Sequence, residues 1–290
     1  MTILAESGAT KTDWRSIASD GTVYSMRSTG MNVATADIAF LEKTLREAIP
    51  KLNPSGETVE RIHFYAAGMI PTPGNPVPEG AVRLHNEFIK AFPEAEVAYS
   101  SDLLAAARAL FGRKPGIAVI LGTGSNSCEY DGKQIVKNVR SGGFILGDEG
   151  GGASLGRQFV SDFLKGIVPE PVASEFAAKY DMEYFNVVKN VYRGPSPARY
   201  LGSFAPFIME HYDSCLYVKC LVDNNFRALF ERCLLQYDIE GKPVGVVGGF
   251  GFAHKEILLR VAQEYGVGIS DIVSSPIEGL VKYYIEENEN

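Results

Sequence analysis

The sequence repeats one design, in which a short apolar strand runs directly into small, hydroxyl-bearing residues. Near the N-terminus, the run at 2–5 is followed by Glu-Ser-Gly-Ala-Thr-Lys-Thr-Asp at 6–13. About halfway along, the run at 117–121 is followed by Gly-Thr-Gly-Ser-Asn at 122–126. Each time a second strand pattern follows, and an Asp-Gly pair joins it to a third, which is typical of a hairpin. The chain is therefore expected to contain two related halves that each open with three strands.

The residues at the end of each first strand suit an anionic ligand. Small residues let backbone N–H groups approach an anion closely, and serine or threonine hydroxyls add further donors. Two such hairpins facing each other could hold a polyphosphate from both sides. The repeat thus favours a two-domain, nucleotide-dependent phosphotransferase.

The rest of the pattern predicts an α/β protein whose halves share three strands followed by alternating helices and strands. Apolar residues recur at helical spacing over 35–49. In the first half the other expected elements are strands at 23–29, 61–67 and 96–99, a proline-rich loop at 71–78, and helices at 79–92 and 102–111. In the second half they are strands at 117–121, 127–130, 134–139, 242–247 and 269–273, and helices at 153–165, over 171–237 with a break at 193–197, at 253–265 and after Pro276.

Composition excludes several classes of partner. The chain has 290 residues, is 46% hydrophobic and carries a net charge of −7, so it can bury a large core but is a poor match for nucleic acid. No apolar run approaches the roughly 18 residues that span a membrane, and no signal peptide is evident. Four cysteines without CxxC spacing are expected to be buried free thiols, which suits a cytoplasmic protein. The histidines show no metal-ligand spacing.

Common nucleotide-binding motifs do not explain the chain. It has no GxxxxGK[ST] loop, and Gly-Thr-Gly at 122–124 lacks the third glycine of a dinucleotide-binding fingerprint. Nor does a protein-kinase catalytic loop accompany its glycine clusters.

Six motifs together resemble the BadF/BadG-type ATPase family, and within it the N-acetylglucosamine kinases. They are SGATKTD at 7–13, SSD at 100–102, GTGSN at 122–126, GDEGGG at 147–152, VVGGFG at 246–251 and SPIEG at 275–279. They extend, in order, over essentially the whole chain. Many proteins of this fold carry aspartate at the end of strand one, where this sequence has Glu6.

The resemblance implies an actin/hexokinase-type fold with two ribonuclease-H-like domains around an interdomain cleft. The expected domains are 1–114, completed by the last helix at 276–290, and 115–275 with a helical insertion. The implied activity is ATP-dependent phosphorylation of an amino-sugar hydroxyl, with ATP and Mg²⁺ as cofactors. The sugar could be N-acetylglucosamine, glucosamine or N-acetylmuramic acid. We expect a homodimer with no nucleic-acid or membrane partner.

Asp102 is the candidate catalytic base. It follows a strand and opens a helix, and its position matches the family's catalytic aspartate. The alternative is a helix cap, although Ser100 and Ser101 already offer capping oxygens. Because a helix N-terminus favours the ionised carboxylate, Asp102 is expected to be a weak base.

The expected sugar site combines two carboxylates with residues from both halves. Asp148 is predicted to bind sugar hydroxyls, while Glu149 is either structural or helps to position Mg²⁺; adjacent carboxylates in an extended loop diverge, which argues against glycosidase chemistry. By resemblance Asn32 contacts the sugar, and a turn-forming asparagine is the alternative. The complete predicted set is Asn32, Asp102, Ser125, Asn126, Gly143 and Asp148.

The expected ATP site uses both hairpin loops and a third glycine cluster. Its predicted residues are Ser7, Gly8, Ala9, Thr10, Lys11, Thr123, Gly124, Gly248, Gly249 and Gly251. Strand alternation could instead turn Lys11 outward, and Asp13 is read as a surface residue. The third cluster would lie against adenosine, or else form a tight strand–helix turn. Glu6 is expected to hold Mg²⁺ directly or through a water.

Two other functions stay open at this stage. An activator-type ATPase of the same family would drive electron transfer to a partner enzyme, but it would carry a cluster-binding cysteine pair, and no two cysteines here have that placement. A sugar-binding regulator that has lost catalysis would be expected to carry an added DNA-binding segment.

Overall fold

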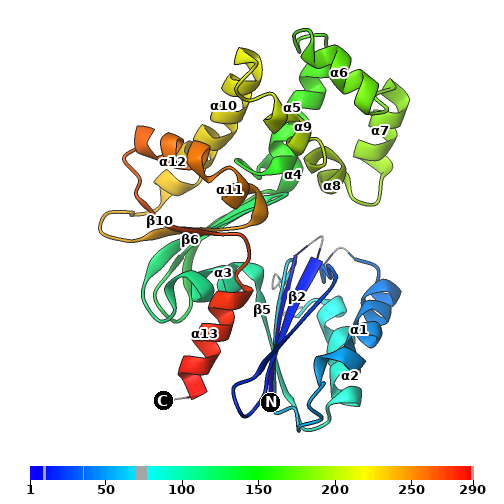
Figure 1. Ribbon diagram of the computed structural model, residues 1–290, viewed down its shortest axis with the longest axis vertical. Helices are drawn as coiled ribbons and strands as arrows, with labels where there is room; N and C mark the ends of the chain where they lie inside the picture. The colour runs from blue at the N-terminus through cyan, green and yellow to red at the C-terminus, as the bar shows by residue number, and fades with distance from the viewer. Residues whose placement is uncertain (9–10, 35, 70–76, 289–290) are drawn as a thin grey trace. The chain divides into compact units, whose positions relative to one another are not determined.

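The computed structural model describes residues 1–8, 11–34, 36–69 and 77–288. Contacts divide the chain into two compact units, each built around a five-stranded sheet (Figure 1). Unit 1 comprises Met1–Lys114, Gly132–Gln134 and Ser275–Asn290, and unit 2 comprises Pro115–Asp131 and Ile135–Ser274.

Unit 1 contains a sheet in the order β3-β2-β1-β4-β5. Its strands are β1 (Thr2–Ser7), β2 (Lys11–Ile17), β3 (Val23–Thr29), β4 (Arg61–Ala66) and β5 (Glu96–Ser101). β1 to β3 are antiparallel neighbours, whereas β4 and β5 run parallel to β1. The helices are α1 (Ile38–Leu52), α2 (Glu79–Ala91), α3 (Asp102–Phe111) and α13 (Ile277–Asn288).

Both faces of this sheet are covered, which explains the unbroken apolar run of β1. Successive strand residues point to opposite faces. Ile3 and Ala5 join the core formed with α1 and α2, which lie together on one side of the sheet in Figure 1. Leu4 and Tyr65 join a second core with α3 and α13. The last helix therefore packs on the unit that the N-terminal strands build.

Unit 2 repeats the same topology. Its strands are β6 (Gly116–Leu121), β7 (Ser125–Tyr130), β8 (Ile135–Val139), β9 (Val244–Val247) and β10 (Ile269–Val273), in the order β10-β9-β6-β7-β8. β6 to β8 are antiparallel neighbours, and β9 and β10 are parallel to β6. The predicted α/β class with two related halves is therefore confirmed.

Helices form most of the remainder of unit 2. They are α4 (Gly143–Leu146), α5 (Gly152–Leu164), α6 (Val172–Lys179), α7 (Tyr184–Arg193), α8 (Pro197–Gly202), α9 (Ala205–Glu210), α10 (Leu216–Arg232), the 3₁₀ helix η1 (Leu234–Gln236), α11 (Gly249–Ala253) and α12 (Lys255–Glu264). One apolar core joins β6 to α5 and α10.

Element boundaries differ from the sequence-based expectation at several points. α1 begins three residues later than predicted because the Asp37 side chain caps it, accepting a hydrogen bond from Phe40 N at 3.1 Å. The helix expected over 253–265 is divided at His254 into α11 and α12. α4 was not predicted, and residues 71–76 of the expected proline-rich loop lie outside the described residues.

All four cysteines are free, but the expectation that they are buried holds only in part. Cys128 and Cys233 are buried, Cys215 is half-buried and Cys220 is exposed. Within the described part of the chain, no helix has the length and apolar character to cross a membrane.

Candidate functional site

The turn between β1 and β2 is closed by backbone and hydroxyl hydrogen bonds. Gly8 N donates to the Lys11 carbonyl at 3.0 Å. The Ser7 hydroxyl lies 2.7 Å from the Thr12 hydroxyl and accepts from Met31 N at 2.8 Å. Ser7 is fully buried, so its hydroxyl stabilises the fold and is not presented to a phosphate as predicted. Ala9 and Thr10, both predicted to contact ATP, lie outside the described residues.

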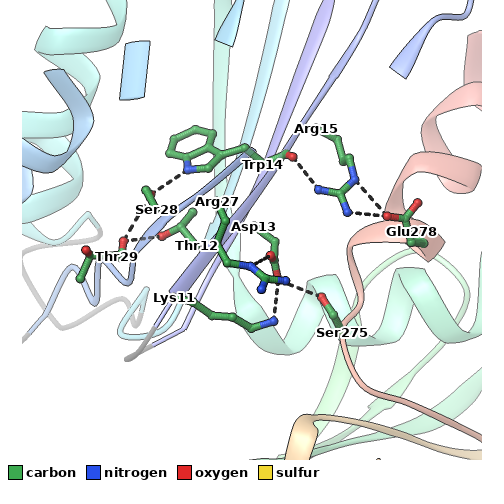
Figure 2. A network of polar contacts seen from close by, with 10 residues as sticks. All are labelled: Lys11, Thr12, Asp13, Trp14, Arg15, Arg27, Ser28, Thr29, Ser275 and Glu278. Atoms are coloured by element: carbon green, nitrogen blue, oxygen red, sulfur yellow. Dashed lines mark hydrogen bonds and ion pairs between the residues drawn. The ribbon is translucent and has the colours of Figure 1, made fainter. Parts of the chain in front are cut away.

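Asp13 lies at the centre of an ionic network that the sequence did not reveal (Figure 2). It accepts hydrogen bonds from Lys11 Nζ and Arg27 Nε, each at 2.7 Å, and from the Ser275 hydroxyl at 3.3 Å. Burial opposes ionisation, but the hydrogen bonds and charges of Lys11 and Arg27 outweigh it and lower the pKa of Asp13. With 2% exposure, Asp13 is not the surface residue that was expected.

The same network decides the position of Lys11. The side chain is 42% exposed, and its ammonium group is engaged by the Asp13 carboxylate. Contact between Lys11 and a phosphate remains a prediction, and it would have to compete with this ion pair.

Glu6, Asp13 and Asp102 form an electrostatically coupled carboxylate cluster on the α3 side of the first sheet. Glu6 pairs in register with Asp13 of β2 and Tyr65 of β4. Burial raises the pKa of Glu6 to about 8, with the charges of Asp102 and Asp13 adding to the effect and Lys11 opposing it. At neutral pH the Glu6 carboxyl is therefore protonated in the protein alone.

Asp102 is the first residue of α3 but does not cap it. The cap is Ser101, whose hydroxyl accepts from Leu104 N at 3.2 Å. The Asp102 carboxylate accepts a hydrogen bond from Leu103 N at 2.9 Å. Burial raises its pKa to about 6, in spite of backbone hydrogen bonds that lower it. The expectation of a weak base is wrong, because desolvation exceeds the effect of the helix N-terminus.

Asn32 behaves as the turn-forming residue that was the alternative to a sugar ligand. Its Oδ1 accepts from Ala34 N at 3.0 Å, and its carbonyl accepts from Ala36 N at 3.0 Å. A sugar contact by Asn32 stays a prediction.

In unit 2, the glycine-threonine loop after β6 is fixed to the start of α5. Gly152 N donates to the Gly122 carbonyl at 2.9 Å, and Ala153 N donates to the Thr123 carbonyl at 2.8 Å. Gly151 is required here, since a Cβ at this position would lie 2.9 Å from the Thr123 carbonyl oxygen. The backbone of this loop, at the carboxyl end of β6, is thus held against the start of α5.

The Asp148 side chain lies against Gly124 of this loop. It adopts a left-handed backbone with φ of 57°, and its Oδ1 accepts from Ser125 N at 3.3 Å. A non-glycine residue in this conformation is uncommon and often marks a functional position. Burial raises the pKa of Asp148, and the neighbouring Glu149 adds to the shift, while the hydrogen bond from Ser125 opposes it.

Glu149 points to different partners, as expected for adjacent carboxylates in an extended loop. Its Oε1 lies 3.1 Å from Arg232 Nε, and Cys233 Sγ lies 3.9 Å from its Oε2. Burial and then the charge of Glu149 raise the pKa of the Cys233 thiol to about 11. These contacts favour a structural role for Glu149, and a part in positioning Mg²⁺ stays a prediction.

The remaining predicted sugar residues differ in how they are held. Ser125 is buried at the start of β7. Asn126 Oδ1 accepts from Asn138 Nδ2 at 2.9 Å. Gly143 starts α4 with φ of 71°. Of these three, Ser125 is tied directly to Asp148.

In the third glycine cluster, two glycines are needed for packing and one has open space beside it. Gly248 has φ of 137° and Gly251 lies against Leu121, so both are required by the strand–helix turn. A Cβ on Gly249 would meet no described atom within 4 Å. Gly249 is thus the one glycine of this cluster whose open face suits a ligand.

Sequence reasoning also missed a cavity of about 790 Å³ in unit 2, between α4, α5 and α10. Ile145, Arg157, Tyr217 and Arg232 are among its lining residues. No sequence signal marks it, since these residues come from three separate elements and share no motif.

The described residues contain no group of three or more His, Cys, Asp or Glu side chains arranged to hold a metal ion by themselves. Mg²⁺ takes only oxygen ligands, and it is commonly bound by one or two carboxylates together with waters and substrate phosphates. The coupled carboxylates of Glu6 and Asp102 fit that mode, with a nucleotide supplying the other ligands.

Comparison with known proteins shows the family of the chain. It is 36% identical to the solved "putative N-acetylglucosamine kinase" of Porphyromonas gingivalis, covering 99% of this chain and 100% of that one with a TM-score of 0.89. The chain belongs to that N-acetylglucosamine kinase family. No protein-family model and no curated protein matches the sequence.

More distant structures share the fold alone. A second "putative N-acetylglucosamine kinase", from Chromobacterium violaceum, is 19% identical over 97% of this chain and 98% of that one, with a TM-score of 0.72. A ROK-family glucokinase from Streptomyces griseus is 15% identical over 100% and 99%, with a TM-score of 0.57. The expected actin/hexokinase-type fold is therefore confirmed.

Proposed function

We propose that this protein is an ATP-dependent kinase that phosphorylates a hydroxyl group of N-acetylglucosamine or a closely related amino sugar. The observation that carries the proposal is the match at 36% identity along nearly the whole chain to a member of the family. The chemistry of Asp102 supports it as well, because a carboxylate with a pKa raised to about 6 suits a general base.

Asp102 would accept the proton of the attacking sugar hydroxyl. With a pKa of about 6 the carboxylate is ionised at neutral pH but retains useful basicity. Phosphoryl transfer passes through a loose transition state, so orienting the hydroxyl matters more than strong deprotonation. The hydrogen bond from Leu103 N fixes the carboxylate for that task.

For ATP, we infer that backbone groups rather than side chains make most contacts. Gly8 in unit 1 and Gly249 in unit 2 are described positions where a Cβ would meet no atom closer than 3.9 Å, which leaves the backbone approachable. Thr123 and Gly124 belong to the proposed set by their place in the loop after β6. Ala9 and Thr10 belong to the same proposed loop by their place in the sequence.

For the metal, we infer that Mg²⁺ is held through Glu6 and the nucleotide phosphates. When bound, it would neutralise charge on the transferred phosphoryl group. Glu6 must lose its proton to act as a ligand, and the positive charge of Lys11, which pairs with Asp13, favours that loss because it lowers the pKa of Glu6.

For the sugar, we infer that Asp148 is the principal hydroxyl acceptor in unit 2. It is positioned by Ser125 N and by its left-handed backbone, as a preorganised binding group should be. Asn126, Gly143 and, in unit 1, Asn32 complete the proposed set.

We further place the chain in the BadF/BadG-type branch, on the strength of GTGSN at 122–126 and GDEGGG at 147–152. We expect it to act as a homodimer in the cytoplasm, where ATP is supplied.

A coupled ATP-consumption assay over a panel of sugars tests the proposal. N-acetylglucosamine should be phosphorylated with a higher kcat/KM than glucose, with glucosamine and N-acetylmuramic acid tested beside it. The variant Asp102→Asn serves as the blank for contaminating kinases. If no amino sugar stimulates ATP consumption above that blank, the protein is not an amino-sugar kinase.

A further inference from the structure

Unit 1 contains a second cavity, of about 220 Å³, that the proposed kinase chemistry does not use. It lies between β4, β5, α3 and α13, and its lining includes His63, Tyr65, Ser100, Arg108 and Tyr284. The pocket lining contains no acidic side chain. It is therefore a cavity with one fixed positive charge and several hydrogen-bonding groups.

Arg108 has no counter-ion among the residues that the structure describes. Its Nη1 donates to the hydroxyls of Tyr65 at 2.6 Å and Tyr284 at 3.3 Å, and its guanidinium lies 5.2 Å from the centre of the Tyr283 ring. Its Nε is buried without a hydrogen-bond partner. A partly buried charge in this state is costly unless something pairs with it.

The tyrosines do not supply the missing negative charge. Burial raises the pKa of Tyr65 and of Tyr284, so both phenols stay neutral at physiological pH. Their hydroxyls orient the guanidinium and leave its charge uncompensated.

His63 is a second residue of the lining with a nitrogen that lacks a hydrogen-bond partner. Its ring stacks on Tyr284 with the centroids 4.1 Å apart, and its Nε2 is buried without a partner. Burial, reinforced by the charges of Arg61 and Arg108, lowers the pKa of His63 to about 4. A neutral imidazole with a proton on Nε2 would donate a hydrogen bond to an anion.

We propose that this cavity binds a small tetrahedral oxyanion of the phosphate type. Such an ion would pair with the planar guanidinium of Arg108, whose geometry suits phosphate oxygens. It would also accept hydrogen bonds from His63 or from the hydroxyls of Tyr65 and Ser100, which belong to residues of the lining. The volume holds such an ion with waters around it, since each water occupies about 30 Å³.

The location gives the site a connection to the rest of unit 1. Arg108 lies in the last turn of α3, the helix whose first residue is Asp102, and Tyr284 belongs to α13. A bound oxyanion would join α3 and α13 to the sheet through one ionic centre.

Anomalous diffraction locates the ion directly. Crystals of the wild-type protein are soaked in selenate, a tetrahedral dianion whose selenium can be identified by its anomalous signal. A peak within hydrogen-bonding distance of the Arg108 guanidinium is expected. If selenate appears only elsewhere, or nowhere, the proposal is overturned.

Binding in solution provides the second test, with matched variants. Inorganic phosphate should raise the melting temperature of the wild-type protein above the value in sodium chloride of equal ionic strength. Arg108→Met should weaken phosphate binding at least tenfold, whereas Arg83→Met, which removes an exposed α2 arginine paired with Glu79, should not. Equal phosphate affinity in Arg108→Met and the wild type would also overturn the proposal.

A third arm compares inorganic phosphate with an amino-sugar phosphate in the same pair of variants. Loss of either ligand's binding in Arg108→Met supports the site. The ligand with the lower Kd for the wild-type protein then shows whether the oxyanion is free phosphate or the phosphate group of a sugar. If neither ligand distinguishes Arg108→Met from Arg83→Met, Arg108 holds no anion.

Discussion

Gly124 lies directly against the carboxylate of Asp148, so that a Cβ at Gly124 would come within 2.7 Å of Asp148 Oδ2. The first glycine of the same loop is different, because a Cβ at Gly122 would meet no described atom within 4 Å. Gly124 thus leaves space for the Asp148 carboxylate, whereas an added Cβ at Gly122 would meet no steric conflict with the described atoms. This contrast gives a matched pair of variants for the sugar site.

Gly124→Ala is expected to displace Asp148 and weaken sugar binding. A lost hydrogen bond to a buried polar group costs about 1–3 kcal/mol, which corresponds to a roughly 5- to 150-fold rise in the Kd of the sugar. Calorimetry should show this rise for Gly124→Ala and little change for Gly122→Ala. Equal sugar affinity in the two variants, both folded, would remove Asp148 from the sugar site.

Asp102→Asn should lower kcat by roughly 10²–10⁴ and leave the affinity for ATP nearly unchanged, since it removes the base but keeps the shape. In the wild type, kcat should rise with pH through about 6, because the base acts only when ionised. Ser101→Ala is the control, as it removes the cap of α3 without touching the base. A pH profile that is flat between 5 and 7, or high activity in Asp102→Asn, would contradict the assignment.

Glu6→Gln should stabilise the metal-free protein in a pH-dependent manner. Because the pKa of Glu6 is raised from 4.5 to about 8, the folded state holds a proton that the unfolded state has released. Stability from this group is complete below pH 4.5 and is lost as pH rises through about 8. Glutamine cannot ionise, so the variant should gain melting temperature over the wild type as pH increases.

The control for this experiment is Glu94→Gln, which changes an exposed glutamate of the same unit. Its melting temperature should follow that of the wild type throughout. If Glu6→Gln behaves like Glu94→Gln between pH 5 and pH 9, Glu6 is not a buried protonated carboxyl.

The sequence predicts the fold well because its signals are local and repeated. Strand alternation and Asp-Gly turns give both β-hairpins, and Ser101 before Asp102 correctly indicates the start of α3. The short helix α4 is missed, since its four residues lie in a glycine-rich stretch without helical periodicity.

The site is predicted less completely because burial and pairing depend on residues distant in the sequence. The sequence suggests that Asp13 is a surface residue, but in the structure Ser275, 262 positions later, donates a hydrogen bond to it. The sequence predicts Ser7 as a phosphate ligand, but in the structure its hydroxyl accepts a hydrogen bond from Met31 N. The basicity of Asp102 likewise depends on desolvation, which no local pattern reports.

Gly8→Val tests whether the first hairpin contacts nucleotide at all. The nearest described atom to a Cβ at Gly8 is the Lys11 carbonyl oxygen at 3.9 Å, so the described chain leaves space for a Cβ and the variant is expected to fold. The added methyl groups would occupy the space through which a phosphate approaches the backbone. The Kd for ATP, measured by calorimetry, should rise at least tenfold while the Kd for the sugar stays near that of the wild type. If Gly8→Val melts like the wild type and binds ATP equally well, the first hairpin does not bind phosphate, and the role proposed for Ala9 and Thr10 falls with it.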